Sequence, residues 1–142
     1  MTETSPILIG PHSVLVGRLL RHYDPFPQLF ARRPTLAMVQ KSPVVNGRVA
    51  VPDFEIPSDA WERGRIRYFM ALYETGQHVD PIELDWKWGQ FAPVSLVLLD
   101  GHHRLCAASL VKLTRIPVSY GGPVDFLDYL TGERRSVPRG YS

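Results

Sequence analysis

The chain has little of several features that would assign it to a class. It has one cysteine, Cys106, which excludes an internal disulfide and favours a reducing compartment. No apolar run approaches the ~20 residues of a membrane span. The first residues also lack the basic and apolar segments of a secretory signal. We therefore expect a cytoplasmic protein with no membrane partner.

The chain also lacks a strong excess of charge of one sign. Its 16 basic and 14 acidic residues leave a net charge of +2. This balance permits contact with a nucleotide or weak contact with DNA, but it argues against strong, sequence-independent DNA binding. With 142 residues, 44% of them hydrophobic, the chain is long enough for one domain with a substantial core.

Prolines are frequent, and many of the 13 lie before residue 60. We expect residues 1–55 to be an N-terminal extension of loops, short strands and a hairpin, packed on a core formed by residues 56–142. Within the extension, residues 15–23 carry leucines and a tyrosine at helical spacing. The two β-branched runs of residues 44–51 flank Asn46-Gly47, which predicts a hairpin.

The helix with the clearest pattern is predicted over residues 59–75. Asp59 and Glu62 have the spacing of a capping box, and Gly76 suits the C-terminal end. Its three arginines, at positions 63, 65 and 67, are expected on a solvated face, the alternative being contact with phosphate or nucleic acid.

The remaining segments predict an α/β (α+β) fold, a small mixed sheet flanked by helices. Strands are predicted at residues 81–85, 94–99 and 115–120, and helices at residues 105–111 and 124–130. Residues 86–90, which include two tryptophans and a lysine, are predicted to form a hairpin loop. These tryptophans either cover a core edge or stack on a base. The tail, residues 133–139, is expected to be frayed.

The most informative motif is Asp100-Gly101-His102-His103-Arg104, between a predicted strand and a predicted helix. Unsatisfied N–H groups and the helix dipole favour an anion at such a helix start. Gly101 lets the chain turn and approach a ligand closely. The guanidinium of Arg104 can bind a phosphate in a bidentate manner. We therefore predict a phosphate site at residues 101–104.

The other polar side chains of the motif leave alternatives open. Asp100 could bind Mg²⁺ beside the phosphate or cap the helix. The histidines could donate to phosphate oxygens, or His103 could act as a general acid or base. His102 and Cys106 share a helix face, but two ligands are too few for a structural zinc site. We therefore expect Cys106 to be buried and inert.

These residues, with Leu98-Leu99 before them and Ile116-Pro117-Val118 after them, resemble the ParB/sulfiredoxin superfamily, including its nuclease-like and free serine kinase branches. The resemblance covers about residues 56–121. It implies a small domain that binds ATP, ADP or CTP with Mg²⁺, its phosphates held at residues 101–104.

The chain departs from two branches of that superfamily. His102 stands where a sulfiredoxin would have its cysteine. Too few residues follow Val118 for the DNA-reading helix-turn-helix of partition proteins, and Gly132-Glu133-Arg134-Arg135 only imitates their motif. For a kinase the additional catalytic acid could be Glu74, Glu83 or Asp85.

The sequence therefore predicts a nucleotide-binding protein that could be a phosphotransferase, an NTPase or a nuclease. In such an enzyme Asp100, His103 and Arg104 would be the catalytic residues, Asp100 also holding the metal. The alternative is a non-catalytic interaction protein of plasmid or phage type that binds DNA or a protein. The sequence gives no oligomeric state.

Overall fold

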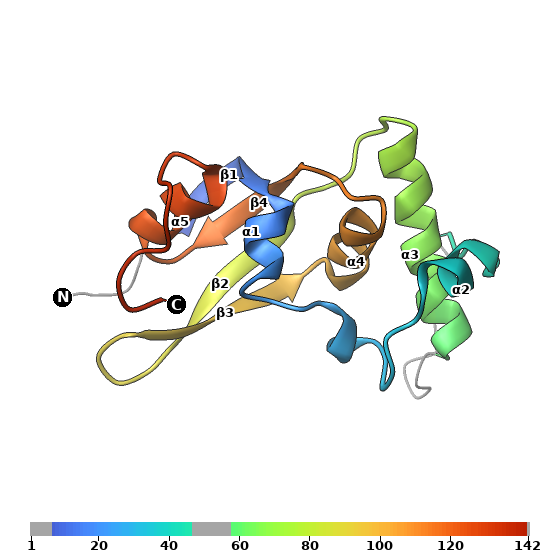
Figure 1. Cartoon of the computed structure of the whole chain (residues 1–142), viewed down its shortest axis with the longest axis horizontal. Helices are drawn as coiled ribbons and strands as arrows, with labels where there is room; N and C mark the ends of the chain where they lie inside the picture. The colour runs from blue at the N-terminus through green and yellow to red at the C-terminus, as the bar shows by residue number, and fades with distance from the viewer. Residues whose placement is uncertain (1–6, 47–57, 142) are drawn as a thin grey trace. The chain divides into compact units, whose positions relative to one another are not determined.

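The computed structural model describes residues 7–46 and 58–141. These residues form a four-stranded mixed sheet and several helices, which confirms the predicted α+β class (Figure 1). They divide into two compact units. A sheet unit takes residues up to 24, 80–101 and from 113 onward, and a helical unit takes residues 25–79 and 102–112. The predicted division at residues 55 and 56 stays a prediction.

The sheet unit has the strand order β1-β4-β2-β3. Its strands are β1 (Ile7–Leu15), β2 (Ile82–Trp88), β3 (Pro93–Asp100) and β4 (Arg115–Gly121). β4 pairs antiparallel with β1 and parallel with β2, and β2 pairs antiparallel with β3. The three strands predicted from the sequence are confirmed.

One face of this sheet is buried. Alternate side chains of β2 and β4 point into a core, as period-two strands require. Trp86 is 7% exposed, and its Nε1 donates to the Tyr120 hydroxyl, which donates to the Pro123 carbonyl. Its ring meets the edge of Phe126 on α5 (Val124–Thr131). α5 is the predicted C-terminal helix, and it ends at Gly132 in the left-handed conformation.

The prediction of a loop over residues 86–90 is wrong in part. Trp86, Lys87 and Trp88 continue β2, and the turn to β3 follows at Gly89, whose N–H donates to the Ala92 carbonyl. Trp86 covers the core, as expected, whereas Trp88 is 42% exposed. Trp86 belongs to the strand and not to a loop, because its buried side chain packs between the sheet and α5.

The prediction of a frayed tail is also wrong. Arg18, on α1 (Val16–Leu20), donates from Nη1 to the carbonyls of Tyr129 at 2.6 Å and Arg134 at 2.7 Å. Its Nη2 donates to the carbonyl of Arg135 at 3.2 Å. The bond to Tyr129 satisfies a carbonyl in the last turn of α5, where a cation is favourable, and the bonds to Arg134 and Arg135 fix the start of the tail.

The helical unit contains η1 (Phe26–Gln28), α2 (Leu36–Lys41), α3 (Asp59–Glu74) and α4 (His102–Leu110). α3 and α4 are the predicted helices. Their shared core is made of buried residues from all four elements and from the loop after η1: Phe26, Phe30, Val39, Ile66, Met70, Cys106 and Ala107. The expected burial of Cys106 is confirmed, at 0% exposure.

The N-terminal cap of α3 differs from the prediction. Ser58, not Asp59, is the cap, and its hydroxyl accepts from the N–H of Trp61. Asp59 therefore occupies the first turn, and Glu62 is turned toward the core with 7% exposure. Gly76 follows the helix with a φ of +70°, as the predicted C-terminal signal requires.

The arginines of α3 are half-buried, so the expectation of a solvated face is wrong for two of them. Arg63 donates from Nε to the Ser42 hydroxyl at 2.9 Å. Arg65 donates to the carbonyl of Val45 at 3.3 Å and lies over the ring of Phe69. Residues 44–46 therefore run along α3 without strand structure, and the rest of the predicted hairpin lies outside the described residues.

Among the described residues, no helix is both long enough and apolar enough to cross a membrane.

Candidate functional site

The motif residues fall in both units. Asp100 and Gly101 end the sheet unit, and His102, His103 and Arg104 begin α4 in the helical unit. The predicted sequence of strand, glycine turn and helix is therefore present in the chain.

Gly101 is required by its surroundings in the sheet unit. Its φ is +105°, and a Cβ atom there would lie 2.5 Å from Cγ2 of Ile82 and 3.3 Å from the Ile82 Cα. Ile82 is itself 1% exposed on β2, so it has little room to move. A side chain at position 101 is thus opposed by both backbone conformation and packing.

Asp100 is the exposed last residue of β3. It is paired across the ladder with Glu83 of β2, after a shift in register between Glu83 and Leu84. The sequence offers Glu74, Glu83 and Asp85 as the additional catalytic acid. Of these three, only Glu83 is paired with Asp100 by the register of β2 and β3. No group of three or more His, Cys, Asp or Glu side chains that could hold a metal ion is present in residues 7–46 and 58–141.

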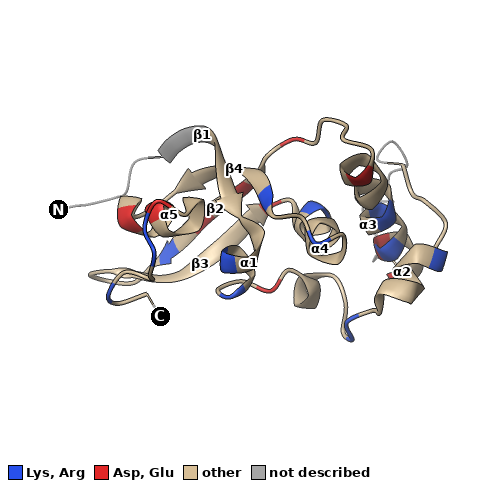
Figure 2. Cartoon of the chain, turned by 45° about the horizontal axis from the view of Figure 1, so that its top comes forward, with Lys and Arg blue, Asp and Glu red and all other residues tan. Residues whose placement is uncertain are grey.

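The first turn of α4 carries His102, His103 and Arg104 and has no acidic residue. All three side chains are half-buried. Further along the helix Leu105 and Cys106 are fully buried, which fixes how α4 packs. The apolar residues of α4 therefore anchor the helix, and its polar first turn presents donors and positive charge (Figure 2).

Glu62 of α3 is a site residue that the sequence analysis missed. Its Oε1 lies 2.9 Å from Nε2 of His103, and both groups belong to the helical unit. The ring of Trp61 meets the His103 ring edge-on at 5.8 Å. A pattern in the sequence could have identified Glu62 as an inward-facing residue. Glu62 precedes Ile66 by four residues and Met70 by eight, so a carboxylate occupies the apolar stripe of α3.

Burial lowers the pKa of His103 below its usual range. The hydrogen bond to Glu62 and its negative charge act in the opposite direction, and the charges of Arg65 and Arg104 lower the pKa further. The imidazole is therefore neutral near pH 7. In that state its Nε2–H donates to the Glu62 carboxylate, and Nδ1 is left as the acceptor.

Positive charge gathers around this pair. Burial lowers the pKa of the Arg65 guanidinium, and the charge of Arg104 lowers it further. The same Arg104 charge partly offsets the effect of burial at Tyr73, whose pKa is raised to about 12. Two guanidinium groups, one on α3 and one on α4, thus repel each other within one partly buried cluster.

The indole of Trp61 adds a hydrogen-bond donor to the cluster. Its Nε1 is buried and has no hydrogen-bond partner among the described residues. A buried donor of this kind costs free energy until it is satisfied. The α3–α4 cluster, by which we mean Trp61, Glu62, Arg65, His103 and Arg104, therefore suits an anion in charge and in donors.

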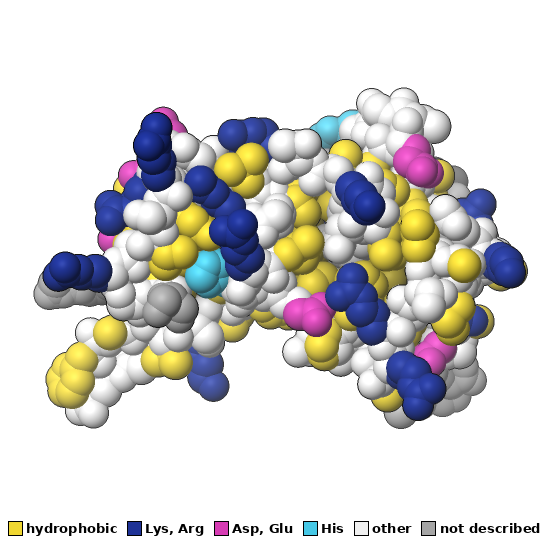
Figure 3. Space-filling model, in the orientation of Figure 1, with side chains coloured by type: hydrophobic (Ala, Val, Ile, Leu, Met, Phe, Trp, Pro, Cys, Tyr) yellow, Lys and Arg dark blue, Asp and Glu magenta, His cyan; other side chains and the backbone are white. Residues whose placement is uncertain are grey.

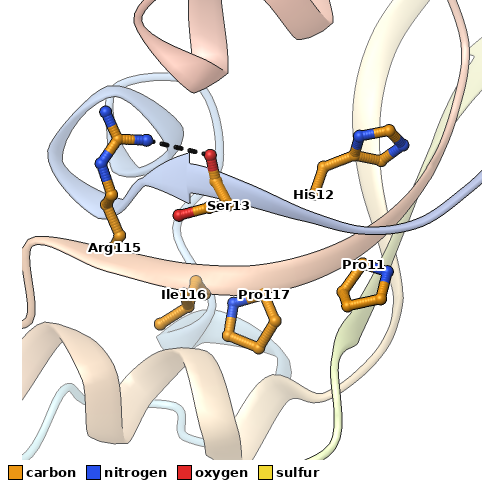
Figure 4. Close-up of a pocket in the computed structure, with 6 residues that line it drawn as sticks. All are labelled: Pro11, His12, Ser13, Arg115, Ile116 and Pro117. Atoms are coloured by element: carbon orange, nitrogen blue, oxygen red, sulfur yellow. Dashed lines mark hydrogen bonds between the residues drawn. The ribbon is translucent and has the colours of Figure 1, made fainter.

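The sheet unit has a separate surface hollow of about 200 Å³ between β1 and β4 (Figure 4). It is lined by prolines 11 and 117, His12, Ser13, Arg115 and Ile116. Arg115 donates from Nη1 to the Ser13 carbonyl at 3.0 Å. The hollow shares no residue with the predicted phosphate site.

Comparisons of the chain with protein-family models, curated proteins and solved structures found no match. The likeness to the ParB/sulfiredoxin superfamily rests on the motif residues alone and stays a prediction.

Proposed function

We propose that the protein binds the phosphate groups of a nucleotide at the first turn of α4, through His102, His103 and Arg104. The observation that carries this proposal is the α3–α4 cluster, in which Arg104 and Arg65 repel each other beside a neutral His103. A bound phosphate would remove that repulsion and accept hydrogen bonds from the guanidinium groups. The N–H groups and dipole at the start of a helix favour the same anion.

The second part of the proposal concerns chemistry. Asp100, the exposed last residue of β3, carries the carboxylate that would hold Mg²⁺. Arg104 would stabilise charge on a transferring phosphoryl group, and Nδ1 of His103 would accept a proton. The reaction class is Mg²⁺-dependent phosphoryl transfer or phosphodiester hydrolysis. Bound Mg²⁺ would supply neutralisation of the phosphate charge.

The binding step is tested by thermal denaturation with ATP, ADP, CTP and GTP, each with Mg²⁺. A nucleotide at one hundred times its dissociation constant adds about 2.7 kcal/mol of stability. For a chain of this length that corresponds to a rise in melting temperature of roughly 5–10 °C. Arg104→Ala should abolish the rise. Arg67→Ala, which removes a half-buried arginine from α3, is the matched control and should keep it.

A rise of equal size in wild type and Arg104→Ala would refute the assignment. If a nucleotide binds, turnover decides the second part. Release of phosphate or cleavage of DNA that is lost in Asp100→Asn supports an enzyme. Saturable binding without turnover supports the alternative of a binding protein whose partner is DNA or another protein.

A further inference from the structure

In the part of the chain that the structure describes, the sheet has two edge strands, β1 and β3. On an edge strand, the N–H and C=O groups of alternate residues point away from the sheet. Another strand can form hydrogen bonds with these groups. β1 contains Pro11 and a shift in register between Leu8 and His12, and such irregularities discourage pairing. β3 is regular through its middle, since residues 95–98 oppose residues 87–84 of β2 one for one.

The side chains of the β2–β3 hairpin are unusually apolar for a surface. Among the described residues, half of the large exposed hydrophobic side chains lie here: Trp88, Phe91, Val94 and Leu99. Val94 is 65% exposed and Leu99 60%. Figure 3 shows hydrophobic side chains at the end of the molecule where Figure 1 draws the turn between β2 and β3. β3 has no charged residue before Asp100, so none of the usual charges blocks this edge.

The distribution of charge favours a second copy of the chain as the partner. At one end of the ladder Glu83 faces Asp100, and toward the other end Lys87 faces Ser95. If β3 pairs antiparallel with its own copy, the acidic end of each hairpin lies beside the lysine end of the other. Along the rest of the strand no charge meets a like charge.

The register follows from the pleat. Side chains opposite each other in an antiparallel pair lie on the same face of the sheet. A residue can therefore oppose its own copy but not the copy of its neighbour in sequence. The twofold axis must lie midway between the two copies of one residue. With Val97 on the axis, Val97 meets Val97 and Ser95 meets Leu99. An axis through Leu96 would instead place Pro93, which has no N–H, inside the ladder opposite Leu99. The axis at Val97 leaves Pro93 outside.

We propose that β3 pairs antiparallel with β3 of a second copy, with Val97 on the twofold axis, to form a continuous eight-stranded sheet. The dimer does not rest on the phosphate site, because the residues that pair across the axis, 95–99, are not part of that site. Wild-type protein is expected to dimerise in a concentration-dependent manner in sedimentation equilibrium.

Cysteine cross-linking tests the register. Opposite residues of antiparallel strands have Cα atoms about 4.5–5.5 Å apart, within the range of a disulfide. Val97→Cys should therefore form a disulfide-linked dimer under mild oxidation, seen by non-reducing electrophoresis. Ser95→Cys is the control. Its two copies would be offset by four residues, about 13 Å, which is too far for a disulfide. Both variants keep the buried Cys106.

A second pair of variants tests the dimer without oxidation. Leu99→Lys places a charge on the paired edge and should weaken dimerisation by about tenfold or more. Val124→Lys changes a residue of similar exposure, 52%, at the start of α5 and should leave it unchanged. A wild-type protein that is monomeric at every concentration would overturn the proposal. Equal cross-linking of the two cysteine variants would overturn the register.

Discussion

Replacing Gly101 with alanine should destabilise the protein strongly. A residue other than glycine at a φ of +105° costs about 1–3 kcal/mol. The new methyl group would lie 2.5 Å from Cγ2 of Ile82 and 3.3 Å from its Cα, and overpacking of this kind costs about 1–3 kcal/mol more. The Ile82 backbone cannot move without disturbing its pairing with β4, since Ile82 faces Val118. We expect a loss of about 2–6 kcal/mol.

Urea denaturation measures this loss directly. With a slope of about 1–3 kcal/mol per molar, the midpoint should fall by roughly 1–2 M. Gly17→Ala is the matched control, because Gly17 lies in α1 with nothing within 4 Å of the added Cβ and no positive φ. That change should leave stability equal or raise it by about 0.5–1 kcal/mol. A Gly101→Ala variant within about 0.5 kcal/mol of wild type would refute the argument that packing and backbone conformation require glycine here.

Two further predictions concern single side chains. The pKa of His103 is lower in the folded protein than in the unfolded chain, so the unfolded chain binds more protons below pH 6.5 and stability falls as pH falls through that range. His103→Gln should reduce this dependence in urea titrations at pH 5 and 7.5, and Glu62→Gln should lower the pKa of His103 further in an NMR titration. An unchanged pKa would contradict the pairing. Arg18→Ala should cost about 1–3 kcal/mol, because three carbonyls lose a charged donor, whereas the exposed Arg21→Ala should cost less than about 0.5 kcal/mol.

Local patterns in the sequence predicted β2, β3 and β4 and the longer helices. Residues 94–99 are mostly apolar, residues 115–120 have apolar side chains at alternate positions 116, 118 and 120, and the period of residues 59–75 is that of a helix. Gly101 was predicted to form the turn between the strand and the helix, because glycine lets the chain turn sharply there. These features depend on neighbours in the chain, so the sequence alone could reveal them.

Contacts between distant residues were beyond the reach of local patterns. Glu62 is turned inward to His103, 41 residues later in the chain. The tail was expected to fray. Arg18, more than 100 residues earlier, supplies its hydrogen bonds. Which polar group meets which depends on helix packing, and that is a property of the folded chain.

By itself the sequence determined the α+β class, the helix and strand periods, the burial of Cys106 and the glycine turn before residues 102–104. Each of these follows from side-chain size, polarity and backbone freedom over a few residues. Only the tertiary structure decided that Arg65 and Arg104 share one cluster, that His103 is neutral against a buried Glu62, and that β3 is an edge. Burial and charge proximity set these properties, and both arise only when distant segments pack together.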